Sequence, residues 1–213
     1  MNKVYFISGL GADKRVFSFL NLSFCEPVFV EWITPNKNES LRNYAIRLRN
    51  QIPDPNPIII GISFGGMLAT EIAKENSAIK VIIISSNKTK REFPLLARLG
   101  KYFPVYKWLP NPIFKKTTIL FKSILGAKGK EKRKLLRQIL LDSDPKFLKW
   151  AIHSILHWEN KTIPENLIHI HGTKDQLLPY RLVAADYTIQ KGKHLMIMDD
   201  HEEISVLLKE LIS

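Results

Sequence analysis

The sequence predicts an α/β protein with a mostly parallel six-stranded sheet flanked by helices and with a helical insertion between two strands. Three observations support this prediction. Short, continuous apolar runs such as Val81–Ile84 recur along the chain, which is typical of strands buried on both faces. Segments with one apolar face at helical spacing separate these runs, and such alternation favours a parallel sheet. The alternation stops between residues 87 and 161, where short helical patterns replace it.

The first half of the chain supplies four strands. Each is an apolar run rich in β-branched or aromatic residues, and the runs lie at 4–8, 27–32, 58–62 and 79–85. Asp13 is the expected N-cap of a helix at about 14–20, and Ser40 is the expected N-cap of a helix over 41–52. A third helical pattern follows Ser63 directly.

The insertion contains no convincing strand pattern. Its helical segments are interrupted by several prolines, and Asn111-Pro112 and Asp144-Pro145 are typical of an N-cap followed by the first helical position. Two further strands are expected at 167–171 and 185–190, before a closing helix. The predicted organisation is therefore an α/β core of residues 1–86 and 162–213, with residues 87–161 inserted as a strongly basic helical cap.

Length and composition indicate one folded domain with this insertion. The chain has 213 residues, 45% of them hydrophobic, and no apolar run approaches the roughly 20 residues that a membrane span needs. The N-terminal residues lack a signal-peptide cleavage pattern, so we expect a cytoplasmic protein. The single cysteine, Cys25, excludes an internal disulfide, and we expect it to be a buried, unreactive thiol.

The net charge of +12 is concentrated in one part of the chain. Between Lys88 and Lys149 there are 17 lysines and arginines against 4 aspartates and glutamates, so this segment carries +13 and the rest of the chain carries −1. A clustered positive field attracts anionic substrates, phospholipid headgroups or nucleic acid. No nucleic-acid recognition motif accompanies the cluster, so we expect no nucleic-acid partner.

The stretch around Ser63 carries the strongest chemical signal. The apolar run 58–62 enters Gly61-Ile62-Ser63-Phe64-Gly65 and passes at once into a helical pattern, which is the context of a nucleophile elbow. In such an elbow the serine lies on a strained turn that lifts its hydroxyl clear of the sheet. The flanking glycines, Gly61 and Gly65, meet a steric demand, because the residues two before and two after the serine come close together.

Two residues further along can complete a nucleophilic site. Acyl transfer through serine needs a base that takes the hydroxyl proton and an acid that orients the base. Asp175 and His194 both follow the ends of predicted strands, where parallel sheets gather functional groups. Asp199 and Asp200 are less suited to the acid role, because they follow His194 closely and are expected to begin the last helix.

At these residues the sequence resembles the α/β-hydrolase superfamily. Residues 61–66 are similar to the family's nucleophile elbow, residues 171–175 to its acid loop and residues 192–194 to its histidine loop. Residues 8–11 are similar to its oxyanion loop, with Ser8 in place of a histidine. The resemblance covers nearly the whole chain apart from the insertion. The chain begins at the segment similar to the family's third strand, which implies a compact version of that fold without the first two strands.

The resemblance implies a role for five residues. Ser63 would be the nucleophile, His194 the general base and then acid, and Asp175 the carboxylate that fixes the imidazole, with the backbone N–H groups of Leu10 and Phe64 forming the oxyanion hole. It also implies that the insertion covers the site and selects the substrate, and that neither a cofactor nor a metal is needed. The His153 and His157 pair lacks the glutamate of a zinc-protease motif, and His169 and His171 are expected to be structural.

The leading interpretation is an esterase-like or thioesterase-like serine hydrolase that works through a covalent acyl-enzyme. Its expected partner is a small ester or thioester, with an anionic substrate or contact with an acidic membrane surface as hypotheses for the basic cap. Two alternatives stay open. The same fold could perform lyase or other non-hydrolytic chemistry, or the chain could be a non-catalytic module that binds anionic lipid through the cap. The oligomeric state is not predicted.

Overall fold

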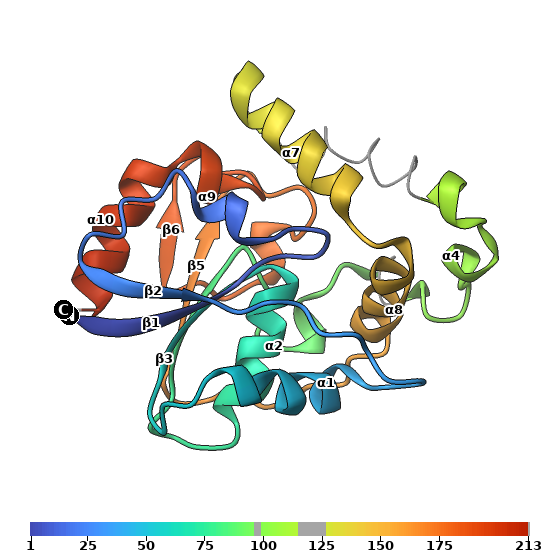
Figure 1. Cartoon of the computed structure of the whole chain (residues 1–213), viewed down its shortest axis with the longest axis horizontal. Coiled ribbons are helices and arrows are strands. Elements are labelled where there is room, and N and C mark those ends of the chain that lie inside the picture. Colours follow the sequence, from blue (N-terminus) through green and yellow to red (C-terminus); the bar gives the residue numbers. More distant parts are fainter. Residues whose placement is uncertain (96–98, 115–126, 213) are drawn as a thin grey trace.

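The computed structural model describes residues 1–95, 99–114 and 127–212. Six strands form one sheet in the order β2-β1-β3-β4-β5-β6, and all five pairings between neighbours are parallel. The strands are β1 Asn2–Ile7, β2 Cys25–Phe29, β3 Ile58–Ile62, β4 Lys80–Ile84, β5 Leu167–Gly172 and β6 Tyr187–Ile189. The predicted α/β class with a six-stranded parallel sheet is therefore confirmed (Figure 1).

The helical segments cover both faces of this sheet and extend beyond it. The α-helices are α1 Leu41–Leu48, α2 Phe64–Ala73, α4 Val105–Trp108, α7 Lys130–Asp142, α8 Pro145–Leu156, α9 Met196–Asp199 and α10 His201–Ile212. The 3-10 turns are η1 Lys14–Phe17, η2 Arg49–Gln51, η3 Lys90–Glu92 and η4 Tyr180–Leu182. Among the described residues, no helix is long and apolar enough to span a membrane.

Alternation along the strands divides the core into two layers. Phe6, Ile60 and Ile82 pack on one face of the sheet with η1, α9 and α10, whereas Ile59 and Val81 pack on the other face with α1 and α2. All five side chains are at most 1% exposed, because helices cover both faces. The continuous apolar runs of the sequence are explained by this double burial.

The two predicted N-caps of the first half are confirmed. Asp13 accepts a hydrogen bond from the backbone N–H of Arg15 at 2.9 Å, and Ser40 accepts one from the N–H of Asn43 at 3.2 Å. The segment after Asp13 is nevertheless a short 3-10 turn that ends at Phe17, where a helix to residue 20 was expected.

The position of β2 also differs from the prediction. The strand runs from Cys25 to Phe29, whereas residues 27–32 were expected. Among the described strands it pairs with β1 alone, and the pairing of Asn2 with Cys25 starts the ladder two residues earlier than expected. Because β2 is an edge strand, Pro27 can lie inside it without removing a hydrogen bond between two central strands.

The inserted segment leaves the sheet after β4 and returns at β5. It contains η3, α4, α7 and α8, and its described residues form no strand. Residues 96–98 and 115–126 of the expected cap lie outside the part that the structure describes. Asp144 caps α8 as predicted, accepting hydrogen bonds from the backbone N–H groups of Lys146 and Phe147. In Figure 1, α4 and α8 lie at the right of the molecule, away from α10 at the left.

Candidate active site

Ser63 occupies a strained turn between β3 and α2. Its backbone angles are φ 50° and ψ −116°, in a region that residues with a side chain rarely adopt. The two flanking glycines explain how the turn can form. A Cβ at Gly61 would lie 2.5 Å from the carbonyl oxygen of Gly65, and a Cβ at Gly65 would lie 2.3 Å from that of Ser8. Only glycine fits either position, so the local sequence determines this turn.

Hydrogen bonds from β4 and the residues after it hold the turn. The backbone N–H of Ser63 donates to the carbonyl of Ile84 at 2.9 Å, and the Ser86 hydroxyl donates to the carbonyl of Ser63 at 2.7 Å. The second bond comes from a residue that the sequence patterns did not single out. The serine hydroxyl itself is left free to interact with other residues.

His194 lies between this hydroxyl and a carboxylate. Its Nε2 is 3.0 Å from Oγ of Ser63, and its Nδ1 is 2.8 Å from Oδ2 of Asp175. Since an ionised carboxylate can only accept, Nδ1 carries the proton in the neutral imidazole, and Nε2 presents a lone pair to the serine. The histidine side chain is almost completely buried, which shields both hydrogen bonds from water.

Asp175 follows β5 and is held as an ionised acceptor. Its Oδ1 accepts hydrogen bonds from the backbone N–H groups of Leu177 and Leu178, each at 2.9 Å. Burial by itself would raise the pKa of this carboxyl. The hydrogen bond and charge of His194, together with the Leu178 N–H and His171, outweigh burial and bring the pKa below its ordinary value. The carboxylate is therefore charged at neutral pH.

The acid and histidine loops are joined through their backbones. The N–H of Thr173 donates to the carbonyl of Ile189 at 3.1 Å, and the N–H of Lys174 donates to the carbonyl of Gly192 at 2.9 Å. A Cβ at Gly172 would lie 2.3 Å from the same Gly192 oxygen, so glycine permits the close approach. This geometry can pass a proton from the serine hydroxyl to the imidazole while the carboxylate stabilises the resulting cation.

The two backbone N–H groups expected to form an oxyanion hole come from loops beside the serine. Leu10 lines the cavity at Ser63, and Phe64 is the first residue of α2. In the described part of the chain, neither N–H donates a hydrogen bond to another residue.

The cavity at Ser63 is small and mostly apolar. It has a volume of about 50 Å³, and Ser63 and His194 line it together with Leu10 and with Leu136 and Leu140 from α7. The inserted segment therefore contributes part of the wall next to the serine.

Several contacts fasten α7 and the turn after it to the loop that carries Leu10. The Ser143 hydroxyl lies 2.8 Å from the carbonyl of Gly11, and Asp142 forms an ion pair of 2.8 Å with Arg15. A neighbouring cavity of about 260 Å³ shares Gly11 with the first and is also lined by Trp32 and Phe147. Part of the insertion, from Leu136 to Ser143, thus lies against the cavity at Ser63 and the segment beside it.

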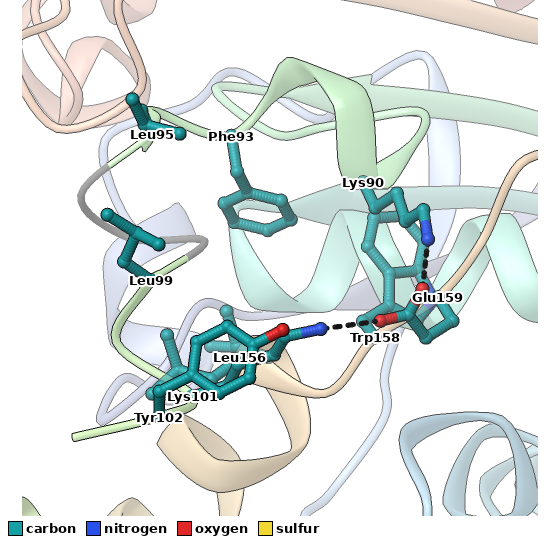
Figure 2. A pocket seen from close by; sticks show the side chains of 10 residues that line it. Lys90, Phe93, Leu95, Leu99, Lys101, Tyr102, Leu156, Trp158 and Glu159 are labelled. Atoms are coloured by element: carbon teal, nitrogen blue, oxygen red, sulfur yellow. Dashed lines mark hydrogen bonds and ion pairs between the residues drawn. The ribbon is translucent and has the colours of Figure 1, made fainter. Parts of the chain in front are cut away.

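A third cavity lies at the far end of the insertion. It has a volume of about 210 Å³, and Ser63, Asp175 and His194 are not among the described residues that line it (Figure 2), which are Lys90, Phe93, Leu95, Leu99, Lys101, Tyr102, Ile155, Leu156, Trp158 and Glu159. Figure 2 shows Lys90 and Lys101 pointing toward Glu159, with which both form ion pairs. Both lysines of this cavity therefore share one carboxylate, and the cavity is separate from the one at Ser63.

A broad hollow with a positive rim lies on the acid and histidine loops. It has a volume of about 720 Å³, and Asp175 is the only acidic residue among those that line it. Four exposed cations of the α/β core surround it, namely Lys174, Arg181, Lys191 and Lys193. None of the four forms an ion pair with a described carboxylate. Lys128 of the insertion completes the rim and pairs with Asp200 at 3.2 Å. The four cations belong to the part of the chain whose net charge is close to zero. The positive charge of the hollow therefore comes from the way the fold brings these residues together.

The other candidate residues lie outside the hydrogen-bonded chain that contains Ser63. His153 bonds to the hydroxyl of Tyr106 at 2.7 Å inside the insertion, and no group of three metal-binding side chains occurs among the described residues. Asp199 accepts a hydrogen bond from the backbone N–H of Lys128, and Asp200 precedes α10 as expected. Cys25 is buried, and burial raises the pKa of its thiol.

Comparisons with known proteins identify the fold. No protein-family model matches the sequence, and no curated protein matches it. An esterase from Exiguobacterium antarcticum has a TM-score of 0.75 at 15% identity, covering 100% of this chain and 92% of that one. A thermophilic esterase from Thermogutta terrifontis has a TM-score of 0.74 at 15% identity, covering 100% and 89%. A meta-cleavage product hydrolase, CumD, from Pseudomonas fluorescens IP01 has a TM-score of 0.69 at 18% identity, covering 100% and 90%. The chain has the α/β-hydrolase fold.

Proposed function

We propose that the chain is a serine hydrolase that cleaves a carboxylic ester or thioester through a covalent acyl-enzyme. One observation supports this most directly. His194 lies 3.0 Å from the Ser63 hydroxyl and 2.8 Å from the Asp175 carboxylate, an arrangement that a nucleophile, a base and an orienting acid require. Several structures that share the fold are of esterases and hydrolases, which agrees with this class of reaction.

In the proposed reaction the Ser63 oxygen attacks the carbonyl carbon of the substrate. His194 accepts the hydroxyl proton on Nε2, and Asp175 stabilises the imidazolium. The tetrahedral intermediate collapses, and the proton passes from His194 to the departing alcohol or thiol. Water then attacks the acyl-enzyme by the same route, which releases the acid and restores the serine.

The backbone N–H groups of Leu10 and Phe64 would stabilise the negative oxygen of each tetrahedral intermediate. Removing one such donor in a related type of site costs on the order of a hundredfold or more in rate. Since both donors are main-chain groups, the serine at position 8 leaves them intact.

A fluorophosphonate probe tests the activated serine. The wild type should be labelled at Ser63, and both Ser63→Ala and His194→Ala should lose labelling while they remain folded by circular dichroism. Absence of labelling in folded wild-type protein would remove the proposal's main support. Ser63 could be labelled while a panel of esters is cleaved to products that contain no added water. In that case the chain would be a lyase with the same fold and not a hydrolase.

Residues 87–161 act in this proposal as a cap that selects the acyl group. Leu136 and Leu140 of α7 line the 50 Å³ cavity with Ser63, and this volume suits a short acyl group unless the cap moves. The adjacent cavity of about 260 Å³ shares Gly11 and Ala12 with the first, and Trp32 and Phe147 give it aromatic walls that suit a longer group.

The basic hollow supports the hypothesis of an anionic substrate. Four exposed cations that pair with no carboxylate in the described part of the chain surround it, next to the loops that carry Asp175 and His194. Such a field attracts a phosphate-bearing leaving group, for example the carrier part of a thioester. In a variant with Lys174→Ala and Lys191→Ala, KM for a phosphorylated ester should rise about tenfold, with KM for a neutral ester unchanged. The control is a variant with Lys37→Ala and Lys161→Ala, which loses the same charge outside the hollow.

A second candidate function is contact with an acidic membrane surface through the insertion. Tyr102, Phe103 and Trp108 are 66%, 74% and 78% exposed, and Lys101 and Lys107 lie among them. Aromatic and cationic side chains together favour the interface of an anionic bilayer. Sedimentation with phosphatidylserine vesicles should fall with salt and with Trp108→Ala. If binding persists while no probe labels Ser63, the chain is better described as a lipid-binding module.

A further inference from the structure

Two buried histidines precede the turn that carries Asp175. His169 and His171 lie on the same face of β5, and neither side chain is exposed. Nε2 of His169 is 3.1 Å from Nδ1 of His171, and Nε2 of His171 is 2.8 Å from the carbonyl oxygen of Leu178. The same Nε2 lies 3.5 Å from Oδ2 of Asp175. The two histidines are therefore hydrogen-bonded to each other and to the turn that carries Asp175.

The acceptors in this cluster determine the tautomers. Because a carbonyl oxygen can only accept, Nε2 of His171 must carry a proton, and Nδ1 of the neutral ring must then accept. His169 consequently donates from its own Nε2, which leaves its Nδ1 without a proton. In agreement, the Nδ1 of His169 has no hydrogen-bond partner in the described structure.

Both rings are neutral at physiological pH. Burial lowers the pKa of His169 to about 2, with the nearby His171 and Lys88 acting in the same direction. Burial also lowers the pKa of His171, although the Leu178 carbonyl and Asp175 partly oppose it. His194 is the other titratable group that acts on His171. Tyr180 stacks on the ring with 6.4 Å between centroids.

We infer that His171 is a positioning residue that holds the Asp175 turn in place for His194, an inference that rests on the proposed serine hydrolysis. The turn is tied at both ends. The N–H groups of Leu177 and Leu178 bond to Oδ1 of Asp175, and the carbonyl of Leu178 bonds to His171. Without the His171 donor, this buried carbonyl would lose its partner and the turn would be free to shift.

A neutral donor suits this position better than a charged one. The 3.5 Å separation between His171 and Oδ2 is too long for a strong hydrogen bond, so Oδ2 keeps His194 as its close partner at 2.8 Å. A lysine or arginine there would compete with the His194 imidazolium for the carboxylate. Since displacements of about 1 Å in a catalytic site can cost on the order of a hundredfold in rate, the turn needs to be held firmly.

Two substitutions at His171 separate hydrogen bonding from packing. Glutamine keeps an N–H donor the same number of bonds from Cα as Nε2, whereas leucine fills the space without a donor. We expect His171→Leu to lower the rate of fluorophosphonate labelling at Ser63 at least tenfold, and His171→Gln to stay within about threefold of the wild type. KM for p-nitrophenyl acetate should change little in either variant.

A double-mutant cycle distinguishes positioning from a general loss of stability. If His171 acts through Asp175, His171→Leu should have almost no further effect on labelling in an Asp175→Asn background. Equal losses in the leucine and glutamine variants, or additive losses with Asp175→Asn, would overturn the inference. Wild-type protein that does not label would instead overturn the proposed function.

Nitrogen NMR of the wild type provides a test that does not depend on a stable leucine variant. With ¹⁵N-labelled histidine, His169 and His171 should both be neutral Nε2–H tautomers at pH 7. An Nδ1–H tautomer at His171 would exclude the bond to Leu178 and with it the positioning role.

Discussion

The residues around Ser63 in the sheet core and the aromatic residues of the inserted segment differ in exposure and in the number of their partners. In the core, Asp175 and His194 are at most 5% exposed, and each has two or more hydrogen-bond partners. In the insertion, aromatic rings such as Trp108 are largely exposed and lysines lie beside them. Buried polar groups need defined partners, whereas exposed groups do not. This difference underlies the proposal that the core carries out the chemistry and that the insertion selects the substrate.

The largest expected effect concerns the acid in the core. Asp175→Asn should lower kcat for p-nitrophenyl acetate on the order of a thousandfold or more, because the amide cannot hold His194 in the required tautomer. Asp200→Asn is the matched control, since Asp200 pairs with Lys128 of the insertion and has no contact with His194. A comparable loss in the Asp200 variant would mean that the acid has been assigned to the wrong residue.

A pair of glycine substitutions compares backbone packing in the two regions. Gly65→Ala should destabilise the protein by about 3 kcal/mol or more, because its Cβ would lie within 2.4 Å of two backbone oxygens. Gly129→Ala in the insertion has φ 80° and ψ 160° and no atom within 4 Å of the new Cβ, so backbone strain alone, of about 1–3 kcal/mol, is expected. Urea unfolding measures both. Similar costs would contradict the tight elbow.

The wall that α7 contributes to the cavity at Ser63 should affect which substrates are accepted and leave the reactivity of Ser63 unchanged. Leu140→Ala enlarges the cavity at Ser63, so kcat/KM for longer p-nitrophenyl esters should rise relative to the acetate by about tenfold. Labelling by a small fluorophosphonate should stay within about twofold of the wild type. A loss of labelling equal to that of Asp175→Asn would show that α7 belongs to the catalytic machinery.

The smallest expected effect is a dependence of stability on pH. His169 has a folded-state pKa of about 2 against an ordinary value of 6.5. Between these two pH values the histidine is protonated in the unfolded chain and neutral in the folded chain. Its stabilising contribution is complete above pH 6.5 and falls as the pH drops below that value. At pH 5.5 the loss is on the order of 1 kcal/mol. His169→Gln should reduce this loss in urea titrations, and His157→Gln, at an exposed position in the insertion, should leave it unchanged.

Much of the fold could be predicted because double burial leaves a plain pattern. The runs at 58–62 and 79–85 became β3 and β4, and the predicted parallel sheet is confirmed. Strand ends were harder to predict. The pairing of β1 with β2 decides where β2 begins, and the pattern of apolar residues does not depend on that pairing. The closing strand, expected at 185–190, is limited to Tyr187–Ile189 by its pairing with β5.

The candidate site was predictable to the extent that it depends on motifs. Ser63, Asp175 and His194 were named from their loops, and the structure brings them within hydrogen-bond distance, while their catalytic roles remain predictions. The contact between His171 and Leu178 depends on how one turn folds back on its strand, which no spacing rule specifies. Similarly, the basic hollow gathers cations from two loops that are separate in sequence, whereas the sequence pointed to the basic cap.

Pre-steady-state hydrolysis of p-nitrophenyl acetate, followed by mass spectrometry of the acid-quenched protein, tests the central claim most directly. The account predicts a burst of nitrophenol close to one equivalent and an acetyl group on the peptide that contains Ser63, with neither in Ser63→Ala. Turnover that continues in Ser63→Ala, or acetyl groups only on surface lysines, would contradict the claim that this core carries an activated serine.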